Sequence, residues 1–517
     1  RQATHREPPM RTEQFFQHHG IEANPFAEED AQTDPVFKNR CRENTYHPAW
    51  DKVFGDLSDP ATSIVFGEKG AGKTAMRLQI TSRIAEHNRD HKQDRLWVIE
   101  YDDFNPLLDC FADRLPVRKQ RDPARVLAEW KLWDHMDALL SLGVTDLIDH
   151  LLDARQRTGP PANRLLPSAT ESEPSLALDH AQKRDLLLLA ACYDDSSAAP
   201  LTSRWKNLRR RLRFGTLGLG NPKRWLEAGL GLGVTTAAAS LMGYLAAWGW
   251  LQGPWLYAVL TLAWLPWLWK WLRFRLKARG VRTQVRVLRR ETATTQRLLM
   301  ALAGADLQNQ PLPNKRRTDD RYELLQKFQG VLRSLGVTGI LVLVDRVDEP
   351  HLTGGKVELM RDLVWSMLDN KFLKQPGIGV KLLLPDELME HLNRETREFH
   401  QRARIDKQNL VPSLDWTGEA LLDLANARLA ACATGGATPT LRGLLAEDIR
   451  EDRLIDAMRS LRTPRHLFKF LYRLIAAHCN AYTDTSPEWR VSRDLFEQAL
   501  ALYSRDQASV DRGLSAG

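Results

Sequence analysis

The chain of 517 residues has few of the features that mark several common protein classes. Its five cysteines form no C-x-x-C pair and no metal-binding spacing, and they are Cys41, Cys110, Cys192, Cys432 and Cys479. This scatter disfavours a disulfide framework and a zinc cluster, and it fits a reducing cytosol. The first 20 residues are polar and contain no apolar signal core. We therefore expect no secretion signal.

Positive charge is concentrated in two short segments and is scarce elsewhere. The formal net charge is +8, but residues 203–227 carry +7 and residues 270–290 carry +9, so the rest of the chain carries −8. Proteins that bind nucleic acid present a basic surface over the binding domain. Because the basicity here is local, the sequence makes nucleic acid an unlikely partner.

The segment VFGEKGAGKT, residues 65–74, matches the phosphate-loop pattern G-x-x-x-x-G-K-[ST]. An apolar strand pattern precedes it and helical spacing follows it, as in loops that hold phosphate at a helix N-terminus. Lys73 would reach the β- and γ-phosphates, and the Thr74 hydroxyl would bind Mg²⁺. The residues predicted to bind nucleotide in this loop are Gly67, Glu68, Lys69, Gly70, Ala71, Gly72, Lys73 and Thr74.

A phosphate loop needs a carboxylate from another strand, and GILVLVDRVDEP at 339–350 supplies the candidates. Five consecutive aliphatic residues predict a buried parallel strand that ends at Asp345. Asp345 would hold Mg²⁺ together with Thr74, and Asp348 or Glu349 would orient the attacking water. The two halves of one nucleotide site would then be separated by a long insertion.

Between the two basic segments, residues 228–269 contain no charge at all. A run of this length is typical of two membrane helices, and Gln252-Gly-Pro254 would form the turn between helices at about 228–251 and 254–272. Eight of the sixteen tryptophans lie between 225 and 271, and basic flanks favour a cytoplasmic side for both ends. The alternative is a buried helical pair in a large core. Anionic lipid would be the partner of the basic flanks.

VFGEKGAGKT and ILVLVDRVDE together resemble the AAA+/STAND division of P-loop NTPases. The pattern D-x-h-D-E at 345–349 is similar to the NACHT Walker B motif, and predicted membrane helices between Walker A and Walker B resemble the KAP group. Arg346 departs from both patterns, since NACHT domains usually have a small residue there and KAP proteins read D-D-h-D-R. The resemblance leaves open which acid activates water.

Other segments resemble further elements of AAA+ proteins. IEANPFAEEDAQTDPVF at 21–37 resembles the N-terminal element of origin-recognition-type and secretion-type ATPases, which implies Asn24, Pro25 and Phe26 near adenine. An ordinary extended turn is the alternative. GIGVKLLLPDEL at 377–388 resembles the strand that carries sensor 1, with Asp386 at its tip.

The resemblance also assigns arginines. SLRTPRHLFKFLYRLI at 460–475 is similar to the sensor 2 helix, which implies that Arg465 contacts the γ-phosphate. Arg397, Arg402 and Arg404 lie where AAA+ proteins place an arginine finger that acts on a neighbouring subunit. Plain surface arginines are the alternative for each of these positions.

We therefore predict an α/β protein with a three-layer P-loop NTPase core and a parallel sheet, an inserted transmembrane helical hairpin, and a C-terminal all-helical lid. The predicted divisions are an N-terminal tail (1–20), a first core segment with Walker A (21–110), a helical insertion (111–202), the hairpin with its flanks (203–290), a second core segment with Walker B (291–412) and the lid (413–517).

The predicted function is a multi-pass ATPase of the inner (cytoplasmic) membrane, with the NTPase domain and both termini in the cytoplasm. It would bind and hydrolyse ATP with Mg²⁺ as a switch for assembly or signalling, as a homo-oligomer with unidentified protein partners. KAP and STAND relatives imply a role in bacterial anti-phage defence. One alternative is a membrane effector, pore or scaffold in which nucleotide serves assembly, because small residues at 229–243 allow close helix packing. A DNA-handling AAA+ ATPase is the other.

Overall fold

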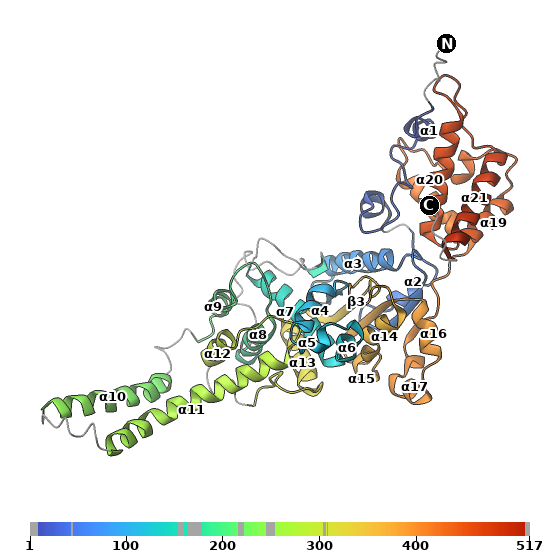
Figure 1. The fold of residues 1–517 in the computed structure, drawn as a ribbon. Helices are drawn as coiled ribbons and strands as arrows, with labels where there is room; N and C mark the ends of the chain where they lie inside the picture. Colours follow the sequence, from blue (N-terminus) through green and yellow to red (C-terminus); the bar gives the residue numbers. More distant parts are fainter. Residues whose placement is uncertain are drawn as a thin grey trace, which may run out of the picture. The chain divides into compact units, whose positions relative to one another are not determined.

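The computed structural model describes residues 9–42, 45–152, 160, 162–163, 178–215, 222–244, 254–302, 307 and 309–511. The chain divides into two compact units (Figure 1). Unit 1 comprises residues 1–104, 160–165 and 339–517, and unit 2 comprises residues 105–159 and 166–338. Unit 1 therefore contains both the phosphate loop and the strand that ends before Asp345.

Unit 1 is built on a five-stranded sheet in the order β2-β3-β4-β1-β5. The strands are β1 (Ser63–Gly67), β2 (Arg95–Tyr101), β3 (Val337–Val344), β4 (Ile378–Pro385) and β5 (Asn409–Val411). β1 runs parallel to β4 and β5, and β3 runs parallel to β4. All residues of β1 and β4 are buried, as expected for aliphatic strands covered on both faces. The α/β class with a parallel sheet is what the sequence predicts.

The helices of unit 1 form two groups, one beside the sheet and one made mainly of the helices that follow β5 in sequence. Those beside the sheet are α2 (Trp50–Phe54), α3 (Lys73–Asp90), α14 (Val357–Val364), α15 (Asn370–Leu373), α16 (Glu387–Asn393) and α17 (Arg397–Ala403), with short helices at Trp365–Met367 and Ile405–Lys407. A further short helix at Phe37–Cys41 contacts the helix Gly418–Ala431. The remaining helices are α1 (Thr12–His18), α18 (Gly418–Ala431), α19 (Glu451–Leu461), α20 (Pro464–Ala481) and α21 (Arg493–Asp511), with a short helix at Leu441–Leu444.

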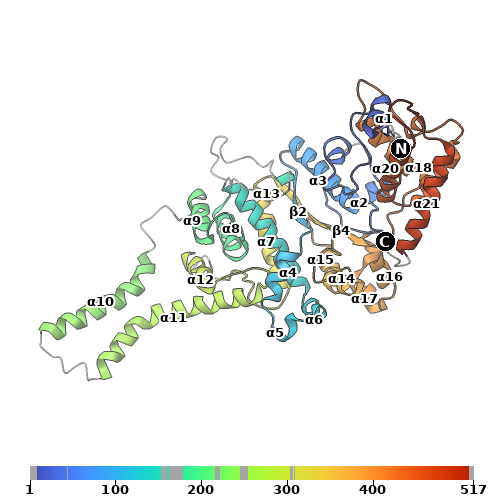
Figure 2. The same cartoon turned by 45° about the horizontal axis from the view of Figure 1, so that its top comes forward.

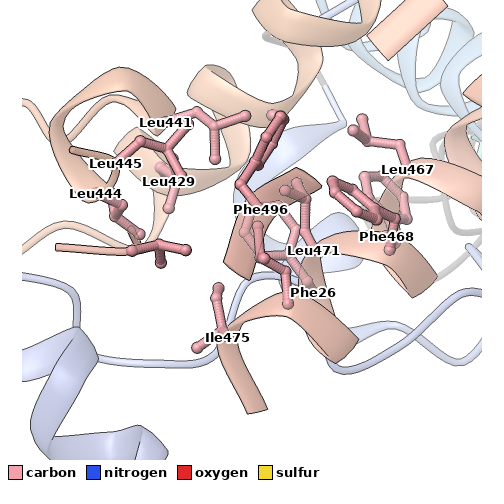
Figure 3. Packing of buried hydrophobic residues seen from close by; sticks show 14 of the residues in the cluster. Phe26, Leu429, Leu441, Leu444, Leu445, Leu467, Phe468, Leu471, Ile475 and Phe496 are labelled. Atoms are coloured by element: carbon pink, nitrogen blue, oxygen red, sulfur yellow. The ribbon is translucent and has the colours of Figure 1, made fainter. Parts of the chain in front are cut away.

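The helices α18 to α21, here called the lid helices, share one hydrophobic core (Figure 3). On α20 the side chains at helical spacing, Leu467, Phe468, Leu471 and Ile475, are all buried. Phe26 from the N-terminal segment joins the same core with 1% of its surface exposed. The N-terminal segment is therefore packed on the lid helices.

Unit 2 is helical over its described residues. Its elements are α4 (Asn105–Ala112), α5 (Val117–Gln120), α6 (Pro123–Ala128), α7 (Leu132–Leu151), α8 (His180–Tyr193), α9 (Leu201–Arg211), α10 (Pro222–Tyr244), α11 (Pro254–Gln284), α12 (Thr292–Ala301) and α13 (Asp319–Ser334).

Buried ion pairs hold the basic segments inside unit 2. On α7, Asp134 pairs with Arg286 at 2.6 Å and Asp149 pairs with Arg204 at 2.7 Å. Both arginines are almost fully buried. Arg204 belongs to the first basic segment and Arg286 to the second. Some of the charge that suggests lipid or nucleic acid in the sequence therefore neutralises carboxylates within the unit.

The prediction of an inserted transmembrane hairpin is wrong. α10 and α11 lie side by side (Figures 1 and 2). Among the described residues, however, no helix is both long enough and apolar enough to cross a bilayer. Residues 245–253, which contain most of the predicted turn, lie outside the described residues.

The reason is how the uncharged run is divided between the two helices. The described uncharged stretch is 17 residues in α10, at 228–244, and 16 residues in α11, at 254–269, whereas a crossing helix needs about 20 apolar residues. Glycine, threonine and serine lower the hydropathy of α10 further. The predicted multi-pass, inner-membrane localisation is wrong for the same reason, and the assignment of both ends to the cytoplasm loses the flanking-charge argument on which it was based. Contact between the basic segments and anionic lipid stays a prediction.

Lys381 is an unexpected charge in the middle of β4. Its side chain is fully buried, and its Nζ donates to the carbonyl oxygens of Phe54 at 3.0 Å and Ala61 at 2.7 Å. Burial lowers the pKa of Lys381 to about 7. The lysine is therefore largely neutral in the folded protein above that pH.

This burial predicts a pH-dependent stability. Between pH 7 and 10.5 the unfolded chain binds a proton at Lys381 that the folded chain does not, so stability rises with pH across this window. From pH 6.5 to 9.5 the free energy of unfolding of the wild type should rise by about 3 kcal/mol relative to Lys381→Met. Urea unfolding at both pH values measures this, with the exposed Lys374→Met as control. If the free energy of unfolding depends equally on pH in the wild type and in Lys381→Met, Lys381 is not the group responsible.

Candidate nucleotide-binding site

The phosphate loop follows β1 and leads directly into α3. Gly70 and Gly72 have φ values of +94° and +101°, which favour glycine. A Cβ atom on Gly70 would lie 2.6 Å from Cβ of Arg465, so a larger residue does not fit there. Trp416 Nε1 donates to the Ala71 carbonyl at 2.8 Å. The loop is thus held from the lid side by Arg465 and Trp416.

The structure brings together the lysine, threonine and aspartate that the sequence predicts for one site. Thr74 Oγ1 donates to Asp345 Oδ2 at 2.9 Å. Lys73 Nζ donates to the carbonyl oxygens of Gly67 at 2.6 Å and Glu68 at 3.0 Å, and so lies over the loop. Burial lowers the pKa of Lys73, and the Asp345 carboxylate opposes that shift.

Arg77 completes this arrangement and was missed in the sequence. Its side chain is 2% exposed, with Nε 3.3 Å from Asp345 Oδ2 and Nη1 3.0 Å from Asp102 and 3.5 Å from Glu100. Burial raises the pKa of Asp345, and the Arg77 guanidinium opposes that shift. The sequence signal that could have indicated this cluster is the pair of acids in YDDF at the end of β2. The carboxyl ends of parallel strands meet at one edge of a sheet, so these acids lie near Asp345.

The residue after Asp345 is an arginine in the left-handed backbone region. Arg346 has φ +60°, and its Nη2 lies 2.6 Å from Glu349 Oε2. Asp348 lies between them in sequence, and its charge raises the pKa of Lys73 against the effect of burial. Arg346, Asp348 and Glu349 all line the same cavity as the phosphate loop.

This cavity of about 310 Å³ lies within unit 1. Its lining includes the phosphate loop from Lys69 to Thr74, Asp345, and Trp416, Arg465 and Phe468 from the lid side. Residues of the N-terminal segment, among them Asp34 and Phe37, also line it. The cavity therefore combines phosphate-binding groups with apolar and aromatic side chains.

The predicted adenine contacts are placed just outside this lining. Phe26 packs against Phe468 with ring centroids 6.2 Å apart, and the Pro25 carbonyl accepts from Arg428 Nε at 2.7 Å. The Asn24 side chain accepts from the Phe26 backbone N–H at 3.0 Å. Residues that line the cavity begin a few positions later, from Glu29. The tripeptide anchors the segment that faces the cavity.

The remaining predicted residues divide into two groups. Arg465 lines the cavity, and Asp386 precedes α16 with its neighbour Glu387 in the lining. Burial raises the pKa of Glu387. The arginines on and after α17 are not among the lining residues, and they are Arg397, Arg402 and Arg404. Their role on a neighbouring subunit stays a prediction.

The oxygen ligands at the loop fit Mg²⁺. Mg²⁺ is usually bound by one or two protein oxygens together with phosphate and water, and the Thr74 hydroxyl and Asp345 carboxylate meet at one point. Across the described stretches of the chain, no three His, Cys, Asp or Glu side chains are grouped to hold a metal by themselves. A metal at this site would therefore be shared with a bound phosphate.

Comparison with known proteins assigns no family to this geometry, because no family model, curated protein or solved structure matches the chain.

Proposed function

We propose that this chain binds ATP with Mg²⁺ in the cavity of unit 1, hydrolyses it, and uses the cycle as a conformational switch. The observation that carries the proposal is the 2.9 Å contact between Thr74 and Asp345, which are 271 positions apart in sequence. A chance match to a phosphate-loop pattern would not be expected to place its threonine in contact with an aspartate at the end of a second buried strand.

The residues that would bind phosphate and Mg²⁺ or act in hydrolysis all line the cavity, and they are Lys73, Thr74, Asp345, Asp348, Glu349 and Arg465. Lys73 would exchange the carbonyl oxygens of Gly67 and Glu68 for phosphate oxygens. Thr74 and Asp345 would hold Mg²⁺, which supplies charge neutralisation at the phosphates. Asp348 or Glu349 would orient water. Arg465 lines the same cavity as these groups.

The contact between the phosphate loop and a lid helix supports a switch. Arg465 lies in the first turn of the lid helix α20, and its backbone N–H donates to the Gly70 carbonyl at 3.4 Å. A γ-phosphate at the loop would attract the Arg465 guanidinium, and its loss on hydrolysis would release it. We also propose that the lid movement controls self-association or binding of another protein.

Thr74→Ala tests the carrying observation. We expect the ATP affinity of the variant in Mg²⁺ to be about tenfold lower than that of the wild type, because a metal ligand is removed. Its ATP affinity in EDTA should equal that of the wild type. Fluorescent-nucleotide titration with Mg²⁺ and with EDTA, together with phosphate release, measures both effects.

Thr74→Ser is the matched control for this test, because it keeps the hydroxyl. The proposal fails if the wild type binds no nucleoside triphosphate. It also fails if Thr74→Ala and Thr74→Ser have the same Mg²⁺ dependence.

A nucleotide-dependent scaffold without turnover is a second candidate. The ion pair between Arg346 and Glu349 favours it, since it occupies one of the two candidate carboxylates for water activation. Tight Mg²⁺-dependent ATP binding without phosphate release from any assembled form would support the scaffold over the ATPase.

A further inference from the structure

Arg346 has no role in the function proposed above, yet it lies in the wall of the nucleotide cavity together with Lys73 and Arg465. We propose that Arg346 recognises the terminal phosphate of a bound triphosphate, and that this contact separates it from Glu349. Arg346 would therefore determine the preference for triphosphate over diphosphate and control when the Glu349 carboxylate is free. This inference rests on the proposed function.

The backbone holds Arg346 and Glu349 on the same side of a tight turn. The Glu349 backbone N–H donates to the Arg346 carbonyl at 3.2 Å, and the side chains meet at 2.6 Å. The left-handed conformation of Arg346 costs about 1 kcal/mol or more for a residue with a side chain. A glycine would avoid this cost but would bring no cation to the cavity. The strained position therefore points to a use for the guanidinium.

The ion pair is weak enough to be exchanged. The side chains of Arg346 and Glu349 are 29% and 52% exposed, so solvent screens the attraction between them. A γ-phosphate offers more negative charge and accepts two parallel hydrogen bonds from a guanidinium. A diphosphate lacks this group. Arg346 should therefore exchange Glu349 for phosphate when a triphosphate binds, but not when a diphosphate binds.

Arg77, the other arginine at the acidic edge of the sheet, is not suited to such movement. It is 2% exposed and contacts three carboxylates, those of Glu100, Asp102 and Asp345. Moving it would leave the buried Asp345 carboxylate without its cationic partner. Arg346 is more exposed, and its ion pair is with Glu349. Of these two arginines, Arg346 is therefore the one that can respond to nucleotide.

A double-mutant cycle on binding tests the exchange without relying on turnover. The affinities of a non-hydrolysable triphosphate analogue and of ADP, both with Mg²⁺, are measured for the wild type, Arg346→Gln, Glu349→Gln and the double variant. Arg346→Gln should weaken the analogue about tenfold and leave ADP nearly unchanged, because a charged hydrogen-bond donor to the γ-phosphate is lost. Arg346→Lys should restore some of the loss.

Glu349→Gln gives the distinguishing result. It removes the competing partner of Arg346, so it should tighten binding of the triphosphate analogue by about threefold in the wild-type background. In the Arg346→Gln background it should have no effect. Arg83→Gln is the matched control, because Arg83 and Glu86 form an exposed pair at the same spacing on α3. Thermal melting confirms that each variant is folded.

Four outcomes separate the hypotheses. Equal losses for the analogue and ADP in Arg346→Gln would overturn the inference, as would an effect of Glu349→Gln that is the same in both backgrounds. If the wild type binds neither nucleotide, the proposed function itself fails. If binding depends on Lys73 but not on Arg346, the function stands and this inference alone fails.

Discussion

Lys73→Ala should lower the affinity for Mg²⁺·ATP by about 100-fold or more, since charge-assisted hydrogen bonds to phosphate are among the strongest that a side chain makes. The Lys73 ammonium is already positioned over the loop by the carbonyl oxygens of Gly67 and Glu68, so little reorganisation precedes phosphate binding. Isothermal titration with ATP measures the loss.

Lys69 offers a matched control for this experiment. It lies in the same loop and lines the same cavity, but its side chain is exposed, and Lys69→Ala keeps the backbone N–H that the loop offers to phosphate. Lys69→Ala should change the affinity by less than about threefold, as expected for an exposed charge. Equal losses in the two variants would show that general electrostatic attraction, and not a phosphate-loop site, holds the nucleotide.

Glu349→Gln should lower the rate of ATP hydrolysis by about 100-fold while ATP remains bound, because the amide cannot accept a proton from water. Steady-state phosphate release and direct nucleotide binding, measured on the same preparation, separate the two effects. The result bears on the arrangement at Arg346, whose pairing with Glu349 keeps that carboxylate near the loop.

Asp348→Asn is the informative comparison, because Asp348 lines the same cavity. If Asp348→Asn abolishes hydrolysis and Glu349→Gln does not, Asp348 is the acid that orients water, and Glu349 serves only as the partner of Arg346. Normal hydrolysis by both variants would assign water activation to a different group.

The sheet and the phosphate end of the site were predictable because they depend on local patterns. Aliphatic runs specify β1, β3 and β4, and the loop motif places Lys73 and Thr74 directly after a strand. Asp345 follows from the same rule applied to β3. These predictions hold since a fully buried parallel strand allows few alternative structures.

The features that were missed depend on strand order, backbone conformation and helix boundaries, which local residue patterns do not specify. The pairing of Arg77 with Asp102 and Glu100 needs the strand order, which a single sequence does not contain. The pair of Arg346 and Glu349 depends on a left-handed residue where no glycine signals it. The uncharged run at 228–269 was misinterpreted because only its total length was considered. In the structure α10 and α11 each contain a shorter uncharged stretch together with charged residues.

The strand order also has a consequence for synthesis on the ribosome. β1 forms hydrogen bonds with β4 and β5, and β4 begins at Ile378, about 300 residues after β1 ends. At cellular rates of translation this separation corresponds to a delay on the order of 15 to 60 s. The apolar strand that precedes the phosphate loop must remain without its sheet partners for this time, while all of unit 2 is made and can fold. A nascent chain released before β4 would carry the complete phosphate-loop motif and still lack both strands that pair with β1.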